Sequence, residues 1–252
     1  MKQFNLTGKT ALVTGGGRGI GKSIALALAE AGANVAVTSR TESELKQVKE
    51  EVEEFSRKAY YSVVDIREKE SIEYFVEEVV EQEGKIDILV NCAGTNKRLP
   101  FLEITEEDWN FIMDINLKSV LFVAQSVIPH MQKQQYGKII NIASLTSELG
   151  FKNMTTYGAS KGGVSQITKA LSTEFAEDGI VTNAIGPGYF KTEMTKSVFD
   201  DEKRVEWMKS RIPLKRTGNV EDLQGAAVFL ASEASDYITG QTIYVDGGWL
   251  SS

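Results

Sequence analysis

The sequence predicts an α/β fold in which a doubly wound, seven-stranded parallel sheet carries helices on both faces. Short apolar runs alternate with longer amphipathic runs from one end of the 252 residues to the other, which is the pattern of right-handed β-α-β crossovers. The composition, with 42% hydrophobic and 25% charged residues, is that of a globular domain. Because the chain has only four prolines and no break in composition, we expect a single domain over residues 1–252.

The strands are expected where short apolar runs occur, and the helices where apolar residues recur every three or four positions. The expected strands are Thr10–Val13, Asn34–Thr38, Tyr60–Val64, Ile86–Val90, Lys138–Ala143, Ile180–Ala184 and Thr242–Val245. The expected helices are Ile20–Ala31, Glu42–Arg57, Lys69–Gln82, Glu106–Met131, Thr155–Glu177 and Val220–Ala231, with a polar segment, Lys191–Arg211, before the last of them.

Charge and cysteine content exclude several classes of protein. A net charge of −7 gives no electrostatic reason to expect nucleic acid or an anionic membrane as a partner. The single cysteine, Cys92, cannot form an internal disulfide, and without a Cys/His cluster we expect no metal site. Met1–Thr10 lacks an apolar signal core, and the apolar stretch Ile115–Pro129 falls short of a membrane span. We therefore expect a cytoplasmic protein.

A glycine-rich turn, Thr14–Gly21, follows the first strand and opens the first helix. Gly15 permits the tight turn, Gly19 lets the backbone approach a pyrophosphate, and Gly21 allows close packing of helix on strand. The free N–H groups and the dipole of the new helix then face the phosphates. A purely structural turn is the competing interpretation, but the position between strand and helix favours a dinucleotide on a Rossmann-type sheet.

The end of the second strand predicts which dinucleotide binds. An NAD-binding site normally has an acidic residue there for the ribose 2′-hydroxyl, whereas this chain has Ser39 and Arg40. A second cation, Arg18, lies inside the glycine turn. Two guanidinium groups and a hydroxyl suit a 2′-phosphate, so we expect NADP(H) to be preferred, with NAD(H) as a second possibility. Alternatively, Arg40 ends a strand in solvent.

Tyr157 and Lys161 are four residues apart near the start of a helix and share one face of it. A neighbouring ammonium favours a phenolate, so we expect a lowered pKa that lets Tyr157 exchange a proton with an alcohol or a carbonyl oxygen. The spacing alone is weak evidence. It gains weight because Ser144, Asn91–Gly94 and Pro187-Gly188 end three strands on the ligand-binding edge of such a sheet.

These motifs, correctly ordered over essentially the whole chain, resemble those of the classical short-chain dehydrogenase/reductases. They are Thr14–Gly21, Asp65, Asn91–Gly94, Asn116, Ser144, Tyr157–Lys161, Pro187-Gly188 and Val245–Gly248. One departure is Cys92, which stands where the family commonly has a second asparagine. The resemblance implies an oxidoreductase that moves a hydride between a nicotinamide cofactor and a carbonyl or alcohol carbon.

The resemblance also implies roles for individual residues. Tyr157 is the general acid/base, Ser144 binds the substrate oxygen, Lys161 holds the nicotinamide ribose and lowers the pKa of the tyrosine, and Asn116 supports a water-mediated proton path. The implied cofactor contacts are Gly15, Arg18, Gly19 and Ile20 in the turn, Ser39 and Arg40, Asp65 and Ile66 at the adenine, Asn91, Ala93 and Gly94 near the adenosine ribose, Tyr157 and Lys161, and Pro187, Gly188, Phe190 and Thr192 at the nicotinamide amide.

Three further segments look like those of gluconate 5-dehydrogenases and related 2-deoxygluconate and ketogluconate enzymes. They are Gly94–Pro100, Ser147–Gly150 and Gly186–Thr195. Lys97 and Arg98 are candidates for binding a sugar-acid carboxylate, and Glu148 and Tyr189 for contacts to the substrate. Solvated loop positions are an equal alternative for the two cations and for Glu148.

Several alternatives stay open. A 3-oxoacyl-[acyl-carrier-protein] reductase would share every catalytic residue, a nucleotide-sugar epimerase uses the same Tyr/Lys pair, and a non-catalytic dinucleotide sensor would keep the glycine turn. We expect the irregular stretch 186–216 to be a mobile segment that covers the substrate. Family resemblance further implies a homotetramer with the helices Glu106–Met131 and Thr155–Glu177 paired across one interface.

Overall fold

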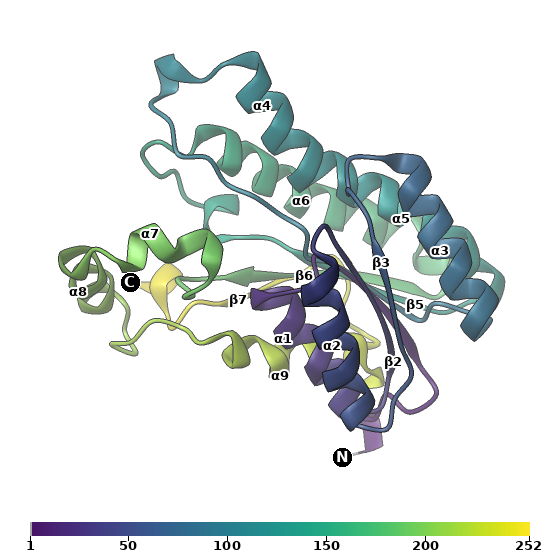
Figure 1. The fold of residues 1–252 in the computed structure, drawn as a ribbon. Helices are drawn as coiled ribbons and strands as arrows, with labels where there is room; N and C mark the ends of the chain where they lie inside the picture. Colours follow the sequence, from purple (N-terminus) through teal and green to yellow (C-terminus); the bar gives the residue numbers. More distant parts are fainter. Residues whose placement is uncertain (1) are drawn as a thin grey trace.

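Seven parallel strands form one sheet in the computed structural model, which describes residues 2–252. The sheet order is β3-β2-β1-β4-β5-β6-β7, so the direction of winding reverses between β1 and β4 (Figure 1). The strands are β1 Thr10–Thr14, β2 Asn34–Ser39, β3 Ala59–Val63, β4 Ile88–Asn91, β5 Gly137–Ile142, β6 Ile180–Pro187 and β7 Thr242–Val245. This topology confirms the predicted fold class, and ligands of such sheets bind where the winding reverses.

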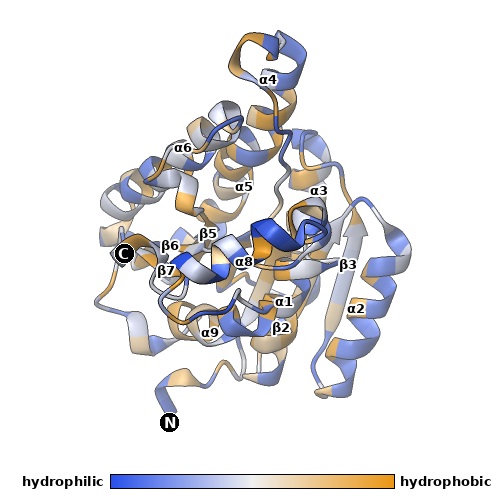
Figure 2. Cartoon of the chain, turned by 90° about the vertical axis from the view of Figure 1, so that its left-hand side faces the viewer, coloured by the Kyte–Doolittle hydropathy of each residue, from blue (hydrophilic) through white to orange (hydrophobic). Residues whose placement is uncertain are grey.

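Helices cover both faces of the sheet. One face carries α1 (Gly19–Glu30), α2 (Glu42–Glu54) and α9 (Gln224–Ala231), and the other carries α3 (Lys69–Glu83), α4 (Glu106–Met113), α5 (Ser119–Gln134) and α6 (Thr155–Glu174) (Figure 1). Strand β1 shows why two layers are needed: Ala11 and Val13 belong to the first apolar cluster and Leu12 to the second. Figure 2 shows apolar residues concentrated on the sides of the helices that face the sheet.

The long helix expected at Glu106–Met131 is interrupted. A π-helical stretch, Asp114–Lys118, separates α4 from α5 and contains Asn116. The extra residue in such a turn re-aims the side chains around it, which is why π-helical turns are common at functional sites. By length and apolar composition alone the run Glu106–Gln134 is sufficient to cross a membrane, contrary to the sequence expectation. Here it is a core helix, with Val127 and Met131 fully buried against the sheet.

The sequence predicts an irregular segment at 186–216, but the structure contains two helices there. These are α7 (Lys196–Phe199) and α8 (Glu202–Arg211), which lie on the same side of the molecule as the C-terminus (Figure 1). Asp201 caps α8 by accepting a hydrogen bond from the Arg204 amide at 3.2 Å. Met208, Ile212 and Trp249 form a small apolar cluster separate from the two main ones. The four-residue spacing of Met208 and Ile212 is a helical signal that the polar composition of the segment conceals.

A buried ladder of polar side chains attaches α6 to the sheet. The Asn91 amide donates to Asn141 Oδ1 at 2.9 Å, Asn141 donates to Thr168 Oγ1 at 2.9 Å, and Thr168 donates to the Val164 carbonyl at 2.8 Å. Asn91, Asn141 and Thr168 are at most 3% exposed. Because unpaired polar groups are costly at such depth, this ladder fixes the position of α6 relative to β4 and β5.

Replacing the middle member of the ladder tests that statement. Asn141→Ala leaves the Asn91 amide without its acceptor, removes the hydrogen bond that the Thr168 hydroxyl accepts and opens a cavity, so we expect a loss of about 2–4 kcal/mol in the free energy of unfolding. Urea denaturation measures it, with the exposed Gln82→Ala on α3 as the control. A loss no greater than that of the control would contradict the assigned role.

Candidate active site

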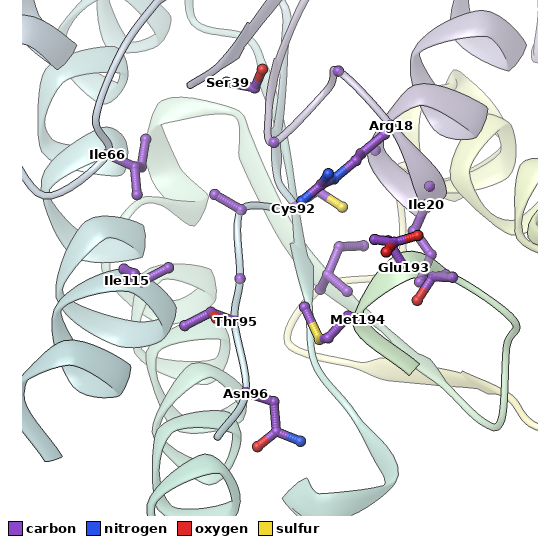
Figure 3. A pocket seen from close by; sticks show the side chains of 18 of the residues that line it. Arg18, Ile20, Ser39, Ile66, Cys92, Thr95, Asn96, Ile115, Glu193 and Met194 are labelled. Atoms are coloured by element: carbon purple, nitrogen blue, oxygen red, sulfur yellow. The ribbon is translucent and has the colours of Figure 1, made fainter. Parts of the chain in front are cut away.

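A cavity of about 440 Å³ lies along the carboxyl ends of the central strands. Its lining includes the residues that directly follow β1, β4 and β5, which are Gly15, Cys92 and Ala143, and also Ser144, the next residue after β5. Figure 3 shows Ser39 at one end of the cavity and Asn96 at the other, with Ile66 and Ile115 on one wall and Glu193 and Met194 on the opposite wall. The cavity is therefore elongated, with one end at β2 and the other near α6.

The glycine turn is shaped for close backbone approach. Gly15 has φ +66°, and a Cβ there would lie 2.8 Å from the Cα of Ala93, so a side chain is excluded on both conformational and steric grounds. A Cβ on Gly21 would lie 2.2 Å from the Gly15 carbonyl oxygen. Thr14 Oγ1 accepts from the amides of Cys92 and Ala93 at 3.1 and 3.2 Å and ties this turn to the end of β4.

The turn leaves the start of α1 open to an anion. Arg18 occupies the N-cap position and makes no side-chain capping hydrogen bond, so the first amides of α1 keep their donors free of a side-chain cap. Gly15, Gly19 and Ile20 line the cavity beside these amides. This arrangement fits the pyrophosphate of a dinucleotide.

Two arginines and a serine surround the end of the cavity at β2. Ser39 is the last residue of β2, and Arg40 follows it; both line the cavity together with Arg18. No carboxylate occupies the last position of β2 itself. Farther along, Asp65 and Ile66 follow β3, and the Arg67 guanidinium hydrogen-bonds Asp65 and lowers the pKa of its carboxyl. These positions fit the adenosine half of a phosphorylated dinucleotide.

Tyr157, Lys161 and Ser144 come together at the other end, as the sequence predicts. Lys161 Nζ donates to the Ile142 carbonyl at 2.7 Å and lies 5.9 Å from the centre of the Tyr157 ring. Ser144 Oγ accepts from the Thr146 amide at 3.2 Å, and its hydroxyl hydrogen-bonds the Tyr157 phenol. All three side chains line the cavity. Because Lys161 is bonded to β5, the first turns of α6 are held against the sheet edge.

The expected lowering of the Tyr157 pKa is not met in the protein alone. Burial raises the pKa of the phenol, and the hydrogen bond from Ser144 and the charge of Arg98 oppose that rise. Burial also lowers the pKa of Lys161 to about 8. The reason is desolvation, which disfavours the charged form of both groups. Next to them, burial raises the pKa of the Cys92 thiol to about 12, so this residue stays uncharged.

Asn116 is fully buried, and its side-chain amide is completely engaged. Its Oδ1 accepts from the Thr95 amide at 2.7 Å, and its Nδ2 donates to the Thr95 carbonyl at 2.9 Å and to Ser160 Oγ at 3.1 Å. The side chain therefore joins the loop after β4 to α6 rather than pointing into the cavity. Asn91 also lies outside the lining, because its amide points into the buried ladder toward Asn141.

Of the remaining expected cofactor residues, Ala93, Gly94, Pro187, Gly188, Phe190 and Thr192 all line the cavity. The other expected substrate residues do not line the cavity; they are Lys97, Arg98, Glu148 and Tyr189. Lys97 pairs with Asp108, which caps α4, and Glu148 accepts from the Tyr244 hydroxyl at 2.9 Å. Tyr189 packs edge-on against Trp249 at 4.9 Å.

Arg98 differs from Lys97, because within residues 2–252 it has no carboxylate partner. Its charge acts on Tyr157 and Tyr189, and Arg204 of α8 lies close enough to lower the pKa of Arg98, although burial contributes more. Burial raises the pKa of Tyr189, against the charges of Arg204, Arg98 and Arg211. The charges of three cations therefore act on this tyrosine.

Sequence reasoning missed several residues of the lining. They are Thr38, Thr41, Glu44, Val64, Thr95, Asn96, Ile115, Ile142, Ala143, Glu193, Met194 and Thr195. Thr95 and Asn96 extend the Asn91–Gly94 motif by two residues, and Glu193–Thr195 extends the segment after β6, so proximity to those motifs was the available signal.

Comparison with known proteins identifies the family. The family profile described as Enoyl-(Acyl carrier protein) reductase matches residues 15–250. A 2-dehydro-3-deoxy-D-gluconate 5-dehydrogenase of Bacillus subtilis is 47% identical over 98% of this chain and 97% of its own. A gluconate 5-dehydrogenase of Burkholderia cenocepacia, solved with NADP and tartrate, superposes with a TM-score of 0.96 at 41% identity and covers 99% of this chain and 98% of its own. The chain belongs to the short-chain dehydrogenase/reductase family.

Relatives within this family differ in their substrates. A 3-oxoacyl-[acyl-carrier-protein] reductase of Staphylococcus epidermidis is 40% identical over 95% of this chain and 98% of its own. The protein is thus an oxidoreductase of the short-chain dehydrogenase/reductase family, as predicted from its motifs.

Gly15→Ala tests the role of the turn in this dehydrogenase/reductase. Because the added methyl meets Ala93 and the φ angle is strained, we expect NADPH to bind at least about tenfold more weakly. Quenching of tryptophan fluorescence measures the affinity, and circular dichroism checks the fold. Gly225→Ala in α9, where a Cβ meets nothing within 4 Å, serves as the control. Unchanged affinity in Gly15→Ala would show that the ligand binds elsewhere.

Proposed function

We propose that the protein interconverts a secondary alcohol and a ketone on a sugar acid, such as gluconate and 5-ketogluconate, with NADP(H) as the preferred cofactor and NAD(H) also accepted. The observation that carries this proposal is the position of the Tyr157 phenol, which lines the cavity beside Ser144 and Lys161 and is under the influence of the charge of Arg98. The names of the relatives at 40–47% identity support the same substrate class.

The cofactor assignment rests on the two ends of the elongated cavity. Arg18, Ser39 and Arg40 provide charge and a hydroxyl for a 2′-phosphate, and the uncapped start of α1 provides donors for the pyrophosphate. When bound, the nicotinamide dinucleotide supplies or accepts the hydride. Pro187–Thr192, at the end of β6, then borders its nicotinamide half.

The proton is handled by residues of this chain. In oxidation Tyr157 accepts the proton of the substrate hydroxyl, and in reduction it gives a proton to the carbonyl oxygen. Ser144 donates a hydrogen bond to the same oxygen and helps to hold the phenol. Lys161, anchored on the Ile142 carbonyl, binds the nicotinamide ribose, and Asn116 keeps the loop carrying Thr95 against α6.

Arg98 is the best candidate for the substrate carboxylate. Lys97 is already paired with Asp108 and Glu148 with Tyr244, so we assign neither to the substrate. Arg98 has no carboxylate partner among residues 2–252, and Arg204 approaches it from α8, which belongs to the segment that we propose covers the substrate. A carboxylate between these guanidinium groups relieves their repulsion.

A carrier-protein reductase remains the second candidate, because the Staphylococcus relative is 40% identical. A screen of C5–C7 aldonates and β-ketoacyl thioesters with both cofactors separates the two. We expect turnover of an aldonate or ketoaldonate at least about tenfold above that of any thioester, as expected when a charged group is matched by a cation. The reverse preference would make the chain a carrier-protein reductase.

We also propose a cytoplasmic homotetramer in which α4, α5 and α6 pair with their copies across one interface. The exposed apolar side chains Trp109 on α4 and Leu121 on α5 support this arrangement, because water-exposed surface of this kind is commonly covered in oligomers.

Tyr157→Phe removes the proton donor and acceptor while keeping the ring. We expect the turnover rate to fall by about 10²–10⁴-fold with the NADPH dissociation constant nearly unchanged. Steady-state kinetics and a binding titration on the same preparation measure the two quantities. Loss of binding with retained turnover would contradict the assigned role.

Arg98→Met removes the proposed carboxylate ligand and also a charge that lowers the pKa of Tyr157. We expect kcat/KM for the sugar acid to fall by about 10–100-fold. Oxidation requires the phenolate form of Tyr157, so the rate of oxidation rises with pH through the pKa of Tyr157. Loss of a nearby cation raises that pKa, so the rising limb of the pH–rate profile moves to higher pH. Lys97→Met is the matched control, because the Lys97 side chain pairs with Asp108. We expect this variant to keep both kcat/KM and the pH position of the rising limb. Equal effects of the two variants would remove Arg98 from the substrate site.

A further inference from the structure

A carboxylate, Glu44, lies at the end of the cavity that holds the two arginines. Glu44 belongs to the first turn of α2 and lines the cavity with Arg18 and Ser39. Its Oε1 lies 3.3 Å from Arg18 Nη1, and its side chain is 29% exposed. A Cβ on Gly17 would lie 2.8 Å from Ser39 Oγ and 3.2 Å from Glu44 Oε2, so the hydroxyl and the carboxylate converge over the glycine turn. Figure 3 shows Arg18 and Ser39 at this end.

Because of Glu44, Arg18 and Arg40 differ in their ion pairing. Arg18 is paired with Glu44, whereas Arg40 has no ion pair among the residues that the structure describes. The neighbouring carboxylate on the same helix, Glu42, points elsewhere: it pairs with Lys46 at 2.9 Å and does not line the cavity. Glu44 is thus the acidic residue of α2 that lines the cavity.

We propose that Glu44 sets the selectivity between the two nicotinamide dinucleotides by competing with a 2′-phosphate for Arg18 and by accepting a hydrogen bond from a 2′-hydroxyl. This inference rests on the proposed dinucleotide site. It assigns a selectivity role to a residue outside the end of β2, where an acidic residue that binds the ribose is normally found.

The physical basis is a balance of like and unlike charges. A 2′-phosphate placed beside Ser39 and Arg40 shares the Arg18 guanidinium with Glu44, and the repulsion of the nearby carboxylate offsets part of the attraction to Arg18. A 2′-hydroxyl carries no charge, leaves the Arg18–Glu44 pair in place and donates to the carboxylate in a charge-assisted hydrogen bond. Glu44 therefore weakens binding of the phosphorylated cofactor and strengthens binding of the other.

Glu44→Gln removes the charge and keeps the shape of the side chain. We expect 2′,5′-ADP and NADPH to bind about three- to tenfold more tightly, because the repulsion is lost at a partly exposed site. We expect 5′-ADP and NADH to bind about two- to threefold more weakly, because the hydroxyl loses a charged acceptor. Isothermal titration calorimetry with the two adenosine fragments and fluorescence titration with the two whole cofactors measure these constants.

Glu42→Gln is the matched control, since it removes the same charge two residues away on α2, from a side chain that does not line the cavity. We expect its ratio of NADPH to NADH affinity to stay within about twofold of that of the unaltered protein. An unchanged ratio in Glu44→Gln overturns the inference. Weaker binding of NADPH also overturns it, because Glu44 would then be orienting Arg18 for the phosphate. Absence of turnover on every substrate with normal nucleotide binding would refute the proposed function alone, and absence of binding of any of the four nucleotides to the unaltered protein would refute both.

Discussion

The attachment of α6 to the carboxyl edge of the sheet is the constraint on which the site depends. Two sets of buried hydrogen bonds make this attachment. Lys161 holds the start of the helix on the Ile142 carbonyl, and the Asn91–Asn141–Thr168 ladder holds the next turns on β4 and β5. Because these donors and acceptors are buried, releasing any of them is costly. Tyr157, one turn before Lys161, therefore has little freedom to leave the cavity.

The electrostatics of the cavity differ from those of the whole molecule. The chain carries a net charge of −7, yet Arg18 and Arg40 line the cavity at its β2 end, Lys161 lines the other end, and the charge of Arg98, outside the lining, acts on Tyr157. This distribution suits a ligand with negative charge at two separated points, and it explains why overall composition said nothing useful about the ligand. Glu44 is the exception, and its place beside Arg18 is where cofactor discrimination is expected to arise.

The parts of the fold that were predictable are those encoded by local pattern. Apolar runs placed all seven strands to within two residues at most ends, and the glycine turn was identified by its position between β1 and α1. The direction of individual side chains was not predictable. Asn91 follows its motif but points into the interior, and Lys97 has the same local context as Arg98 but finds Asp108. Such outcomes depend on partners distant in the chain. The raised pKa of Tyr157 is likewise a consequence of burial, which pairwise spacing does not report.

The most direct measurement is a crystal structure of the protein with NADP⁺ and a bound sugar acid. We predict that the phenol oxygen of Tyr157 lies within hydrogen-bonding distance of the reacting hydroxyl, about 2.6–3.2 Å, with that carbon facing the nicotinamide ring. A sugar acid bound with its hydroxyl beyond the reach of Tyr157, or a nicotinamide ring outside the cavity, would contradict this account.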